Sequence, residues 1–445
     1  MNLGFLLMSG GLSSRMGTPK ALLTLGSETL LARIAREGES FPERILSVNN
    51  PAIPTPQGYA RTEDLYTGCG PMGGLHAALS RCASDALAVA PCDAPHYSAK
   101  IARFLAAALE EGVDAVIPED ETGRAHPMMG IYAKSCLPAL TEHLESGRFK
   151  LMMMLSGLNV RRVRLPEDIP QTVFGNLNTP EDYAALQRAY LLEGMERIAR
   201  QAGRIILGFG DFHVEEKEGH ANFVTNVDTS VQAYLSQALP ALLPGSAFIG
   251  EDQENEALTD QPTWIIDPVD GTTNLIHNYR HSAVSIALAQ AGRPVLAVVY
   301  HPYADELYAA ALEQGATLNG QPMRVSGTPF DRALVGFGTS PYNADLAEKS
   351  LSLALGCLKN CADLRRSGSA ALDLAYVACG RLDVFFELML QPWDFAAGAL
   401  LVTEAGGCFM MPFGDGQVRF DRPQGVLATN GLCAEKALET IESAK

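Results

Sequence analysis

The stretch at residues 264–274 constrains the fold of the second half of the chain more strongly than any other feature of the sequence. The apolar residues 264–266 predict the end of a buried strand. Asp267-Pro268 should break that strand, because proline cannot donate to a strand ladder. Asp267 and Asp270 flank the resulting turn, so both carboxylates can face one point. Gly271-Thr272-Thr273 then predicts a helix start with free backbone N–H groups.

Carboxylates so close to the start of a helix indicate a particular kind of binding site. Carboxylates bind hard cations, and the N-terminus of a helix binds phosphate. The stretch therefore predicts a metal-assisted phosphate site, whereas the simpler interpretation is a capped turn between a strand and a helix. Distant motifs favour the site: Glu251-Asp252 follows the apolar residues 247–249, and Asp394 stands at the mouth of a helix-like run of small residues.

These motifs, together and in this order, resemble the signatures of the inositol monophosphatase family of metal-dependent, lithium-sensitive phosphomonoesterases. The resemblance runs from about residue 191 to residue 445. It implies a layered α-β-α-β-α sugar-phosphatase fold, Mg²⁺-dependent hydrolysis of a phosphomonoester, and a homodimer formed through this domain. Residues 258–264 are close to inositol-phosphatase sequences and favour inositol 1-phosphate. The alternative substrates are 3′-phosphoadenosine 5′-phosphate and a sugar bisphosphate.

The resemblance also implies roles for individual residues. Two or three Mg²⁺ ions would be held by Glu251, Asp267, Asp270, Asp394 and the backbone carbonyl of Val269. Asp228 with Thr272 would orient the attacking water as a general-base pair, and Glu251 belongs to the same catalytic group. The substrate would contact Lys217, Gly271, Thr272, Thr273, Gly368, Ser369, Ala370 and Glu387. The chain departs from the family pattern at Asp252, which replaces a glutamate, and at Asn222, which replaces an aspartate near the third metal.

A glycine-rich loop organises the first half of the chain. The apolar residues 3–8 predict a buried strand, which runs into the loop at residues 9–20. Glycines let a backbone approach an anion closely, and Arg15 and Lys20 add positive charge to the same loop. The loop is neither a Walker P-loop nor a dinucleotide-binding turn, and the simpler interpretation is a surface loop. It resembles the opening loop of the nucleotidyltransferases that activate sugars and molybdopterin, which grip the triphosphate there.

Alternating strand and helix patterns continue to about residue 187 and bring further motifs. The residues 70–74 (Gly-Pro-Met-Gly-Gly) precede a helix, Asp93 follows a strand, and residues 176–180 (Asn-Leu-Asn-Thr-Pro) close the segment. A carboxylate at the end of a parallel strand is a standard place to hold Mg²⁺ between nucleotide phosphates. With the opening loop and His126-Pro127, these motifs resemble the molybdenum-cofactor guanylyltransferase family.

This second resemblance implies a Rossmann-like three-layer domain that transfers a guanylyl group from GTP to molybdopterin. Arg15 and Lys20 would act on the phosphates, and Asp93 would bind one Mg²⁺. Contacts to the nucleotide are expected from Ser9, Gly10, Gly11, Leu12, Arg15, Lys20, Asn49, Asp64, Asp93 and Asn178. Related cytidylyltransferases share the loop, so the base stays open. A different alternative is that one of the domains binds or scaffolds without catalysis.

The expected boundary between the domains lies inside a helix. Apolar residues recur at steps of about three and four residues, so that residues 181–204 predict one nearly continuous helix, with no linker rich in Gly, Ser or Pro. We therefore expect a nucleotidyltransferase domain at 1–188 and a phosphatase domain at 189–445. Strands expected at 282–289 and 294–300 are almost entirely apolar, which predicts a sheet covered on both faces.

Charge and cysteine content exclude several classes of protein. The formal net charge of −17 argues against a surface for nucleic acid or for anionic membranes. The nine cysteines form no C-x-x-C pair and are typical of reduced thiols in a cytoplasmic protein. No apolar run approaches the roughly 18 residues of a membrane span. The expected partners are small molecules: an NTP, a phosphorylated polyol or nucleotide, and molybdopterin.

Overall fold

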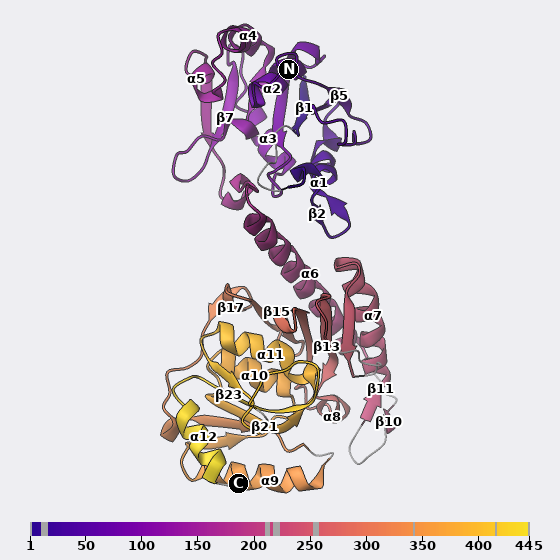
Figure 1. Ribbon diagram of the computed structural model, residues 1–445, viewed down its shortest axis with the longest axis vertical. Helices are drawn as coiled ribbons and strands as arrows, with labels where there is room; N and C mark the ends of the chain where they lie inside the picture. The colour runs from indigo at the N-terminus through magenta and orange to yellow at the C-terminus, as the bar shows by residue number, and fades with distance from the viewer. Residues whose placement is uncertain are drawn as a thin grey trace. The chain divides into compact units, whose positions relative to one another are not determined.

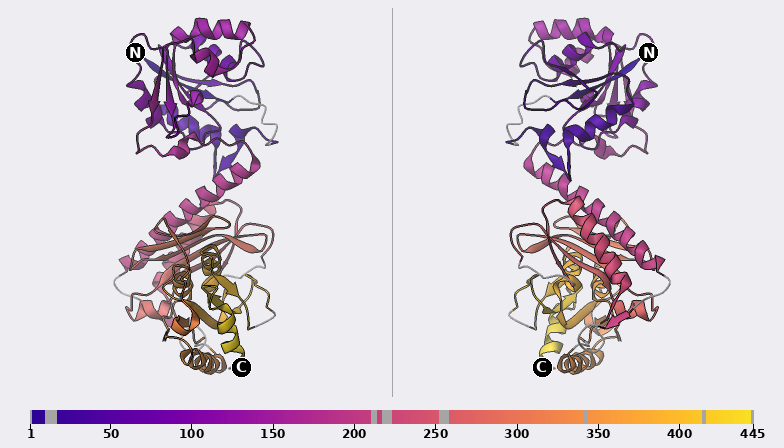
Figure 2. Two further views of the ribbon diagram at one scale, coloured as in Figure 1. Left: turned by 90° about the vertical axis from the view of Figure 1, so that its left-hand side faces the viewer. Right: turned by 90° about the vertical axis from the view of Figure 1, so that its right-hand side faces the viewer.

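A computed structural model of the chain describes residues 2–9, 17–209, 214–216, 223–251, 258–340, 343–413 and 416–443, with the backbone alone for 214–216, 223, 442 and 443. The chain divides into two compact units, Met1–Gln187 and Arg188–Lys445, here called unit 1 and unit 2 (Figures 1 and 2). Within the described ranges, no helix is both long enough and apolar enough to cross a membrane.

Unit 1 is built on a seven-stranded sheet in the order β5-β4-β1-β6-β8-β7-β9. Its strands are β1 (Leu3–Met8), β4 (Arg44–Ser47), β5 (Ala60–Thr62), β6 (Ala86–Pro91), β7 (Ala115–Glu119), β8 (Ile131–Ala133) and β9 (Val160–Arg164). Neighbouring strands are parallel except where β8 pairs with β6 and β7. A short ribbon of β2 (Thr24–Leu25) and β3 (Glu28–Thr29) stands apart from this sheet.

Helices cover both faces of the sheet of unit 1. Side chains alternate along β1, so Phe5 and Leu7 enter one buried cluster and Leu6 and Met8 enter the other. The first face carries α1 (Leu30–Glu37) and α3 (Ala99–Ala106), and the second carries α2 (Pro71–Arg81), α4 (Leu137–Glu145) and α5 (Leu151–Leu155). The predicted Rossmann-like three-layer fold is confirmed. Short 3-10 helices are η1 (Lys20–Leu22), η2 (Gly38–Ser40), η3 (Pro127–Met129), η4 (Lys134–Cys136) and η5 (Gln171–Phe174).

The predicted continuous helix is α6 (Pro180–Gly208), and the division between the units falls within it. Its first turns belong to unit 1, where Oη of Tyr183 donates to the carbonyl of Thr24 at 2.6 Å. Its later turns belong to unit 2, where Met195, Ile198 and Ala202 are part of a buried cluster. One helix therefore contributes residues to both units.

Unit 2 contains two sheets and a small hairpin. The seven-stranded sheet has the order β12-β13-β14-β15-β16-β17-β18, and the five-stranded sheet has the order β20-β19-β21-β23-β22. The strands of the first are β12 (Ala247–Gly250), β13 (Thr263–Asp270), β14 (Ala283–Gln290), β15 (Arg293–His301), β16 (Glu306–Ala311), β17 (Gly315–Leu318) and β18 (Gln321–Met323). Those of the second are β19 (Leu334–Phe337), β20 (Asp363–Arg365), β21 (Val384–Leu390), β22 (Cys408–Met410) and β23 (Gln424–Thr429). The hairpin pairs β10 (Val214–Glu216) with β11 (Phe223–Thr225).

Helices alternate with these sheets to give the predicted α-β-α-β-α order, which is confirmed. The outer layers are α6 with α7 (Asn226–Leu242) and α9 (Ala344–Leu358) with α12 (Ala434–Ser443). The central layer is α10 (Ala370–Ala378) with α11 (Pro392–Glu404), seen between the two sheets in Figure 1. Figure 2 shows α9 and α12 together on the outer side of the smaller sheet. A 3-10 helix, η6 (Phe330–Arg332), precedes β19.

The apolar character of β14 follows from this order of layers. Val284, Ile286 and Leu288 pack with α6 and α7, whereas Ala283 and Ala287 pack with α10 and α11. The small residues face the central helices, which lets those helices approach closely. The prediction that this sheet is covered on both faces is confirmed.

Candidate functional sites

A cluster of carboxylates lies in unit 2 where β12, β13 and α11 meet. One oxygen atom each of Asp267, Asp270 and Asp394 lies within 4.8 Å of the others. Asp267 and Asp270 belong to β13, and Asp394 occupies the N3 position of α11. Glu251 directly follows β12, which runs parallel to β13 and ends opposite the residue before Asp267. The fold therefore brings together carboxylates that are far apart in the sequence.

The predicted break of the strand at Pro268 is wrong. β13 continues to Asp270, and its pairing with β14 shifts in register between Asp267 and Asp270. A β-bulge accommodates proline, because one residue there need not donate to the ladder. In a regular strand, residues three apart point to opposite faces. The irregular register is therefore what allows Asp267 and Asp270 to share one cluster.

Burial and mutual repulsion act on these carboxyl groups. Burial, followed by the charge of Asp270, raises the pKa of Asp267 and the pKa of Asp394 well above the ordinary value. Burial raises the pKa of Asp270 to about 6, although hydrogen bonds from the Ser369 side chain and nearby backbone oppose the shift. Buried like charges cost free energy unless a cation or a proton compensates them. Carboxylate oxygens are the ligands that Mg²⁺ prefers, so the residues present fit the expected ion.

The predicted general-base pair and a backbone carbonyl lie beside this cluster. Oγ1 of Thr272 donates to Oδ1 of Asp228 at 2.9 Å and lies 3.1 Å from the carbonyl oxygen of Val269. Oδ2 of Asp228 accepts from the backbone nitrogen of Thr225 at 2.9 Å, in a capping box at the start of α7. Burial raises the pKa of Asp228. The structure thus places Asp228, Thr272 and Val269 together, as the general-base hypothesis requires.

The predicted helix start is confirmed at α8 (Thr272–Ile276). Gly271 precedes it with a φ of 89°, and a Cβ atom there would lie 3.1 Å from the carbonyl oxygen of His281. Both facts require glycine, since this φ is unfavourable for other residues. Asn274 in this helix donates through Nδ2 to the carbonyl of His281 at 2.7 Å and to that of Ser367 at 3.0 Å.

The turn at residues 367–370 lies against Asp270. Oγ of Ser369 donates to Oδ2 of Asp270, and the backbone nitrogen of Ala371 donates to the same oxygen at 2.9 Å. Gly368 in this turn has a φ of 88°. Residues 368–370, which were predicted to contact the alcohol of the substrate, therefore adjoin a predicted metal ligand.

Glu387 lies on β21 and is buried. Its Oε1 accepts a hydrogen bond from the backbone nitrogen of Ser340 at 3.1 Å. Burial raises its pKa to about 7, although the hydrogen bond from Ser340 and the charge of Arg366 oppose the shift. A Cβ atom at Gly338 would lie 1.9 Å from Oε2 of Glu387, so the carboxylate can occupy this position only beside glycine.

Unit 1 brings a second group of predicted residues together. Nζ of Lys20 lies 3.0 Å from Oδ2 of Asp93 and 3.2 Å from Oδ1 of Asn178. The backbone nitrogen of Leu177 donates to the carbonyl of Asp93 at 2.9 Å, which fixes the segment before α6 to the end of β6. The cation, the acid and the amide thus converge from three distant segments of the chain.

Asn49 and Asp64 form a separate pair in unit 1. Nδ2 of Asn49 donates to Oδ2 of Asp64 at 2.9 Å, and the backbone nitrogen of Asp64 donates back to Oδ1 of Asn49 at 2.9 Å. A Cβ atom at Gly73 would lie 3.0 Å from Oδ2 of Asp64, so the glycine-rich start of α2 packs directly against this pair. Ser9 is buried, and its backbone nitrogen donates to the carbonyl of Ser47 at 2.9 Å.

Several predicted site residues lie outside the described residues. In unit 1 they are Gly10, Gly11, Leu12 and Arg15 of the opening loop. In unit 2 they are Lys217, together with the departures from the family pattern at Asn222 and Asp252. The predictions for these residues remain predictions.

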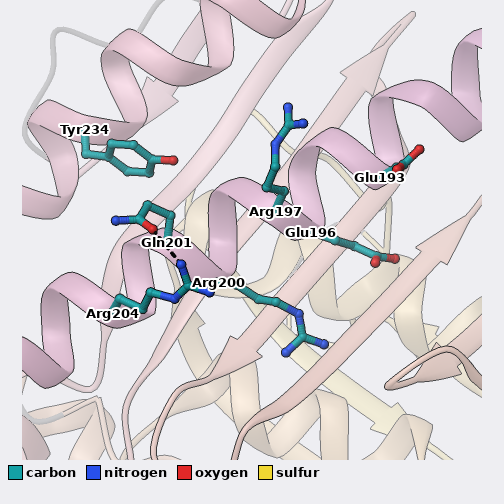
Figure 3. A pocket seen from close by; sticks show the side chains of 7 residues that line it. All are labelled: Glu193, Glu196, Arg197, Arg200, Gln201, Arg204 and Tyr234. Atoms are coloured by element: carbon teal, nitrogen blue, oxygen red, sulfur yellow. Dashed lines mark hydrogen bonds between the residues drawn. The ribbon is translucent and has the colours of Figure 1, made fainter.

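A hollow of about 540 Å³ opens on unit 2 between α6 and α7 (Figure 3). It is lined by Glu193, Glu196, Arg197, Arg200, Gln201, Arg204 and Tyr234. Among these residues, Arg200 pairs with Asp305 at 2.8 Å, and Arg204 donates to Gln201 at 3.1 Å. None of the lining residues is a predicted site residue, and we assign no chemistry to this hollow.

Sequence reasoning missed Ser340, Ser367 and Asp373, all of which lie around the predicted substrate contacts. Asp373 is 3% exposed, and its Oδ2 accepts from Oγ of Ser367 at 2.7 Å. An aspartate in the first turn of a helix is usually exposed to solvent, so the position of Asp373 in the sequence did not indicate a functional residue. The one available signal was that Asp373 interrupts the otherwise apolar segment 370–375.

Comparison with known proteins agrees with this division of the chain. The inositol monophosphatase family matches residues 187–445, and the MobA-like NTP transferase domain matches residues 5–160. Nus factor SuhB of Escherichia coli strain K12 is 46% identical over 217 residues, which cover 47% of this chain and 81% of that protein. Inositol monophosphatase 2 of Solanum lycopersicum is 42% identical over 270 residues, which cover 56% of this chain and 96% of that protein.

Solved structures resemble the phosphatase fold in the same way. The extragenic suppressor protein suhB of Bartonella henselae is 32% identical with a TM-score of 0.53, covering 57% of this chain and 98% of that one. An inositol monophosphatase of Thermotoga maritima is 29% identical with a TM-score of 0.52, covering 57% of this chain and 97% of that one.

Fold and carboxylate cluster thus define unit 2 as a phosphatase of the metal-dependent, layered α/β class. The chain belongs to the inositol monophosphatase family, and it carries a MobA-like NTP transferase domain fused ahead of the phosphatase.

Proposed function

We propose that unit 2 hydrolyses inositol 1-phosphate with Mg²⁺ held by Glu251, Asp267, Asp270, Asp394 and the carbonyl of Val269. The observation that carries this proposal is the meeting of Asp267, Asp270 and Asp394 within 4.8 Å, next to the start of α8. Bound Mg²⁺ supplies positive charge to the phosphoryl oxygens and lowers the pKa of coordinated water. The acidic residues that match the family pattern support two bound ions. Binding of a third ion depends on Asn222, which replaces an aspartate of that pattern.

The residues of the chain then carry out the remaining tasks. Thr272 donates its hydroxyl hydrogen to Asp228, so a lone pair of its oxygen can accept a hydrogen bond from the attacking water. The proton of that water passes to the Thr272–Asp228 pair as the water attacks phosphorus. The backbone N–H groups of Gly271, Thr272 and Thr273 hold the phosphate at the start of α8. Lys217 would add a positive charge to the same site.

The alcohol part of the substrate contacts Glu387 and the turn formed by Gly368, Ser369 and Ala370. A carboxylate accepts hydrogen bonds from hydroxyl groups but repels a second phosphate. Glu387 therefore favours a polyol monophosphate over the alternatives, a nucleotide 3′,5′-bisphosphate and a sugar bisphosphate. The sequence similarity to inositol monophosphatase 2 supports the same choice.

A panel of phosphomonoesters tests this assignment. Phosphate release from inositol 1-phosphate should exceed release from 3′-phosphoadenosine 5′-phosphate and from fructose 1,6-bisphosphate, and it should require Mg²⁺. Glu387→Gln should raise the KM for inositol 1-phosphate more than the KM for a simple aryl phosphate. Faster hydrolysis of either bisphosphate would contradict the assignment.

We propose that unit 1 transfers a guanylyl group from GTP to molybdopterin. The convergence of Lys20, Asp93 and Asn178 carries this proposal, because it places a phosphate-binding cation beside a carboxylate that could hold one Mg²⁺. Arg15 with Ser9, Gly10, Gly11 and Leu12 would surround the phosphates. The Asn49–Asp64 pair would contact the nucleoside.

Calorimetric titration of the chain with GTP and with CTP in the presence of Mg²⁺ separates the alternatives for unit 1. Binding of GTP alone supports the guanylyl assignment, and binding of CTP alone supports a cytidylyltransferase. Binding without pyrophosphate release in the presence of molybdopterin would support the nucleotide-binding module without catalysis.

We further infer a homodimer formed through unit 2, and a cytoplasmic location. The location is supported by the nine cysteines, all of which are free thiols. The formal net charge of −17 supports small-molecule partners over nucleic acid and membranes. The domain boundaries 1–188 and 189–445 are part of the same proposal.

A further inference from the structure

Asp373 and Ser367 form a buried contact beneath the carboxylate cluster. Asp373 lies on the first turn of α10 and is 3% exposed. Oγ of Ser367 donates to its Oδ2 at 2.7 Å. Burial raises the pKa of Asp373 well above its ordinary value, and the charges of Asp270 and Glu387 add to the shift. A buried carboxylate is costly, and a single hydroxyl donor offsets only part of that cost.

Ser367 fixes the turn that follows it. The backbone nitrogen of Ser369 donates to Oγ of Ser367 at 3.2 Å, so the hydroxyl joins Asp373 to the backbone of the turn. The carbonyl of Ser367 accepts from Nδ2 of Asn274 at 3.0 Å, which ties the same residue to α8. Gly368 between these contacts has a φ of 88°. The turn is thus held from α10 on one side and from α8 on the other.

The chain of contacts ends at a predicted metal ligand. Oγ of Ser369 donates to Oδ2 of Asp270, and the backbone nitrogen of Ala371 donates to the same oxygen at 2.9 Å. Two donors thus hold Oδ2 of Asp270, and the backbone of Ala370 also hydrogen-bonds to this carboxylate. The rotamer of Asp270 therefore depends on the position of Ser369. The position of Ser369 depends in turn on the contacts of Ser367 and Asp373.

We propose that Asp373 and Ser367 are positioning residues for the phosphatase site: they hold the 367–370 turn so that Asp270 presents a fixed oxygen to Mg²⁺. This inference rests on the proposed phosphatase function and extends it to residues outside the predicted ligand set. Groups that orient metal ligands commonly change metal affinity by roughly 10- to 100-fold when they are removed. A purely structural role, in which Asp373 stabilises the N-terminus of α10, predicts no such change.

The test measures Mg²⁺ affinity without turnover, by the MgCl₂ dependence of the melting temperature of the full chain, beside kcat and KM. Asp373→Ala and Ser367→Ala should each weaken Mg²⁺ binding by roughly 10-fold or more. Asp373→Asn keeps an oxygen that can accept from Ser367, so it should restore most of the affinity. The double variant should bind Mg²⁺ about as weakly as either single variant, because both act through one chain of contacts.

Asp383 and Ser326 provide a matched control pair in the same unit. Asp383 is also buried and accepts from Oγ of Ser326 and from the backbone nitrogen of Leu334, but none of these residues is a predicted site residue. Asp383→Ala and Ser326→Ala should lower the melting temperature and leave the Mg²⁺ affinity unchanged.

Wild-type Mg²⁺ affinity in Ser367→Ala would overturn the proposal, and that variant remains decisive if Asp373→Ala does not fold. The proposal would also be overturned if Asp373→Asn bound Mg²⁺ as weakly as Asp373→Ala while Ser367→Ala bound it normally. The negative charge of Asp373, and not the position of the turn, would then determine the Mg²⁺ affinity. If the wild type hydrolyses no inositol 1-phosphate but these variants still lose Mg²⁺ affinity, the proposed substrate fails and the positioning role stands.

Discussion

At the scale of single residues, Asp270 is under two opposing influences. Donors from Ser369 and Ala371 favour its charged form, whereas burial and the charge of Glu251 disfavour it. In the absence of a cation the repulsion is uncompensated. A cap, by contrast, stabilises its helix by the same amount with or without metal. The stability of variants at this position therefore distinguishes a metal ligand from a structural cap.

Asp270→Asn should make the metal-free protein as stable as the wild type or more stable, because the substitution relieves repulsion while the amide oxygen can still accept from Ser369. Hydrolysis should collapse, since an amide is a weaker ligand for Mg²⁺. Melting curves with and without Mg²⁺, beside rates of phosphate release, measure both effects. A capping role predicts instead a loss of about 1 kcal/mol with activity retained.

The raised pKa values of Asp270 and Glu387 predict how stability depends on pH. Their ordinary values are 3.8 and 4.5, and in the folded protein they are about 6 and about 7. Between about pH 4 and pH 7 these two carboxyl groups therefore bind more protons in the folded state than in the unfolded state, so their contribution to the free energy of unfolding falls as the pH rises. Burial lowers the pKa values of His76, His281 and His301, whose contributions run in the opposite direction up to their ordinary value of 6.5. Glu306, whose pKa is lowered by Arg381, has the opposite effect only below its ordinary value of 4.5.

In EDTA, the stability contributed by Asp270 and Glu387 should accordingly be lower at pH 8 than at pH 5.5, with a difference on the order of a few kcal/mol. Glu387→Gln should reduce this difference, because it removes one of the titrating groups. Addition of Mg²⁺ should stabilise the protein more at pH 8 than at pH 5.5, since the ion binds the deprotonated carboxylates. A pH dependence of the melting temperature in EDTA that is the same in the wild type and in Glu387→Gln would contradict the prediction.

Lys20 should govern the chemistry of unit 1 alone. Lys20→Ala removes the cation that contacts Asp93 and Asn178. A charge-assisted contact is worth roughly 1.5–3 kcal/mol, so the affinity for Mg-GTP should fall by about 10- to 100-fold. Rates of phosphate release should not change. Lys100→Ala, at an exposed position of unit 1, is the control, and normal nucleotide binding by Lys20→Ala would contradict the assignment of the loop.

At the scale of elements, the central helices α10 and α11 decide the geometry of the phosphatase site. The backbone of α10 donates to Asp270 through Ala371, and α11 carries Asp394. The helices approach closely at Gly398, where a Cβ atom would lie 2.5 Å from the side chain of Leu374. The packing of the two helices therefore influences how Asp394 lies relative to the Ala371 donor of Asp270.

Gly398→Ala should push α10 and α11 apart and destabilise the protein by about 1–3 kcal/mol, as overpacking does in other cores. It should also weaken Mg²⁺ binding, because the packing of α10 against α11 positions the groups of the carboxylate cluster. Gly208→Ala is the control: that glycine ends α6 and has no atom within 4 Å of its added Cβ. If Gly398→Ala melts and binds Mg²⁺ like the wild type, the contact does not set the site.

At the scale of the whole molecule, each unit has its own buried clusters. Those of unit 1 draw only on residues before 188, and those of unit 2 only on residues after 188. α6 contributes to both units without interruption. A single domain core usually folds cooperatively by itself, and a shared helix need not change this.

Fragments comprising residues 1–188 and 189–445 should therefore each be soluble and should each unfold cooperatively. The second fragment retains the α6 residues Met195, Ile198 and Ala202, which pack in its core. Calorimetry of each fragment and of the full chain measures the two transitions. If neither fragment folds alone, α6 is part of a common core and the proposed boundary is wrong.

Local sequence was sufficient for those features that depend on near neighbours. Apolar periodicity predicted α6, because burial on one face repeats with the period of a helix. The almost continuous apolar runs predicted β14 and β15, because a sheet covered on both faces buries successive side chains. The spacing of Asp267, Asp270 and Gly271 predicted carboxylates beside a helix start. The roles of Glu251, Asp394 and Glu387, which are far from that stretch, depended on family resemblance and could not be obtained from spacing.

Only the tertiary structure decided what depends on distant parts of the chain. β13 continues through Pro268 because β14 shifts in register beside it, and no local pattern records the partner strand. Asp373 has the spacing of a solvated helix residue, yet it is buried beneath the 367–370 turn. A sequence fixes which side chains are available, whereas burial, register and pKa depend on what other segments pack against them.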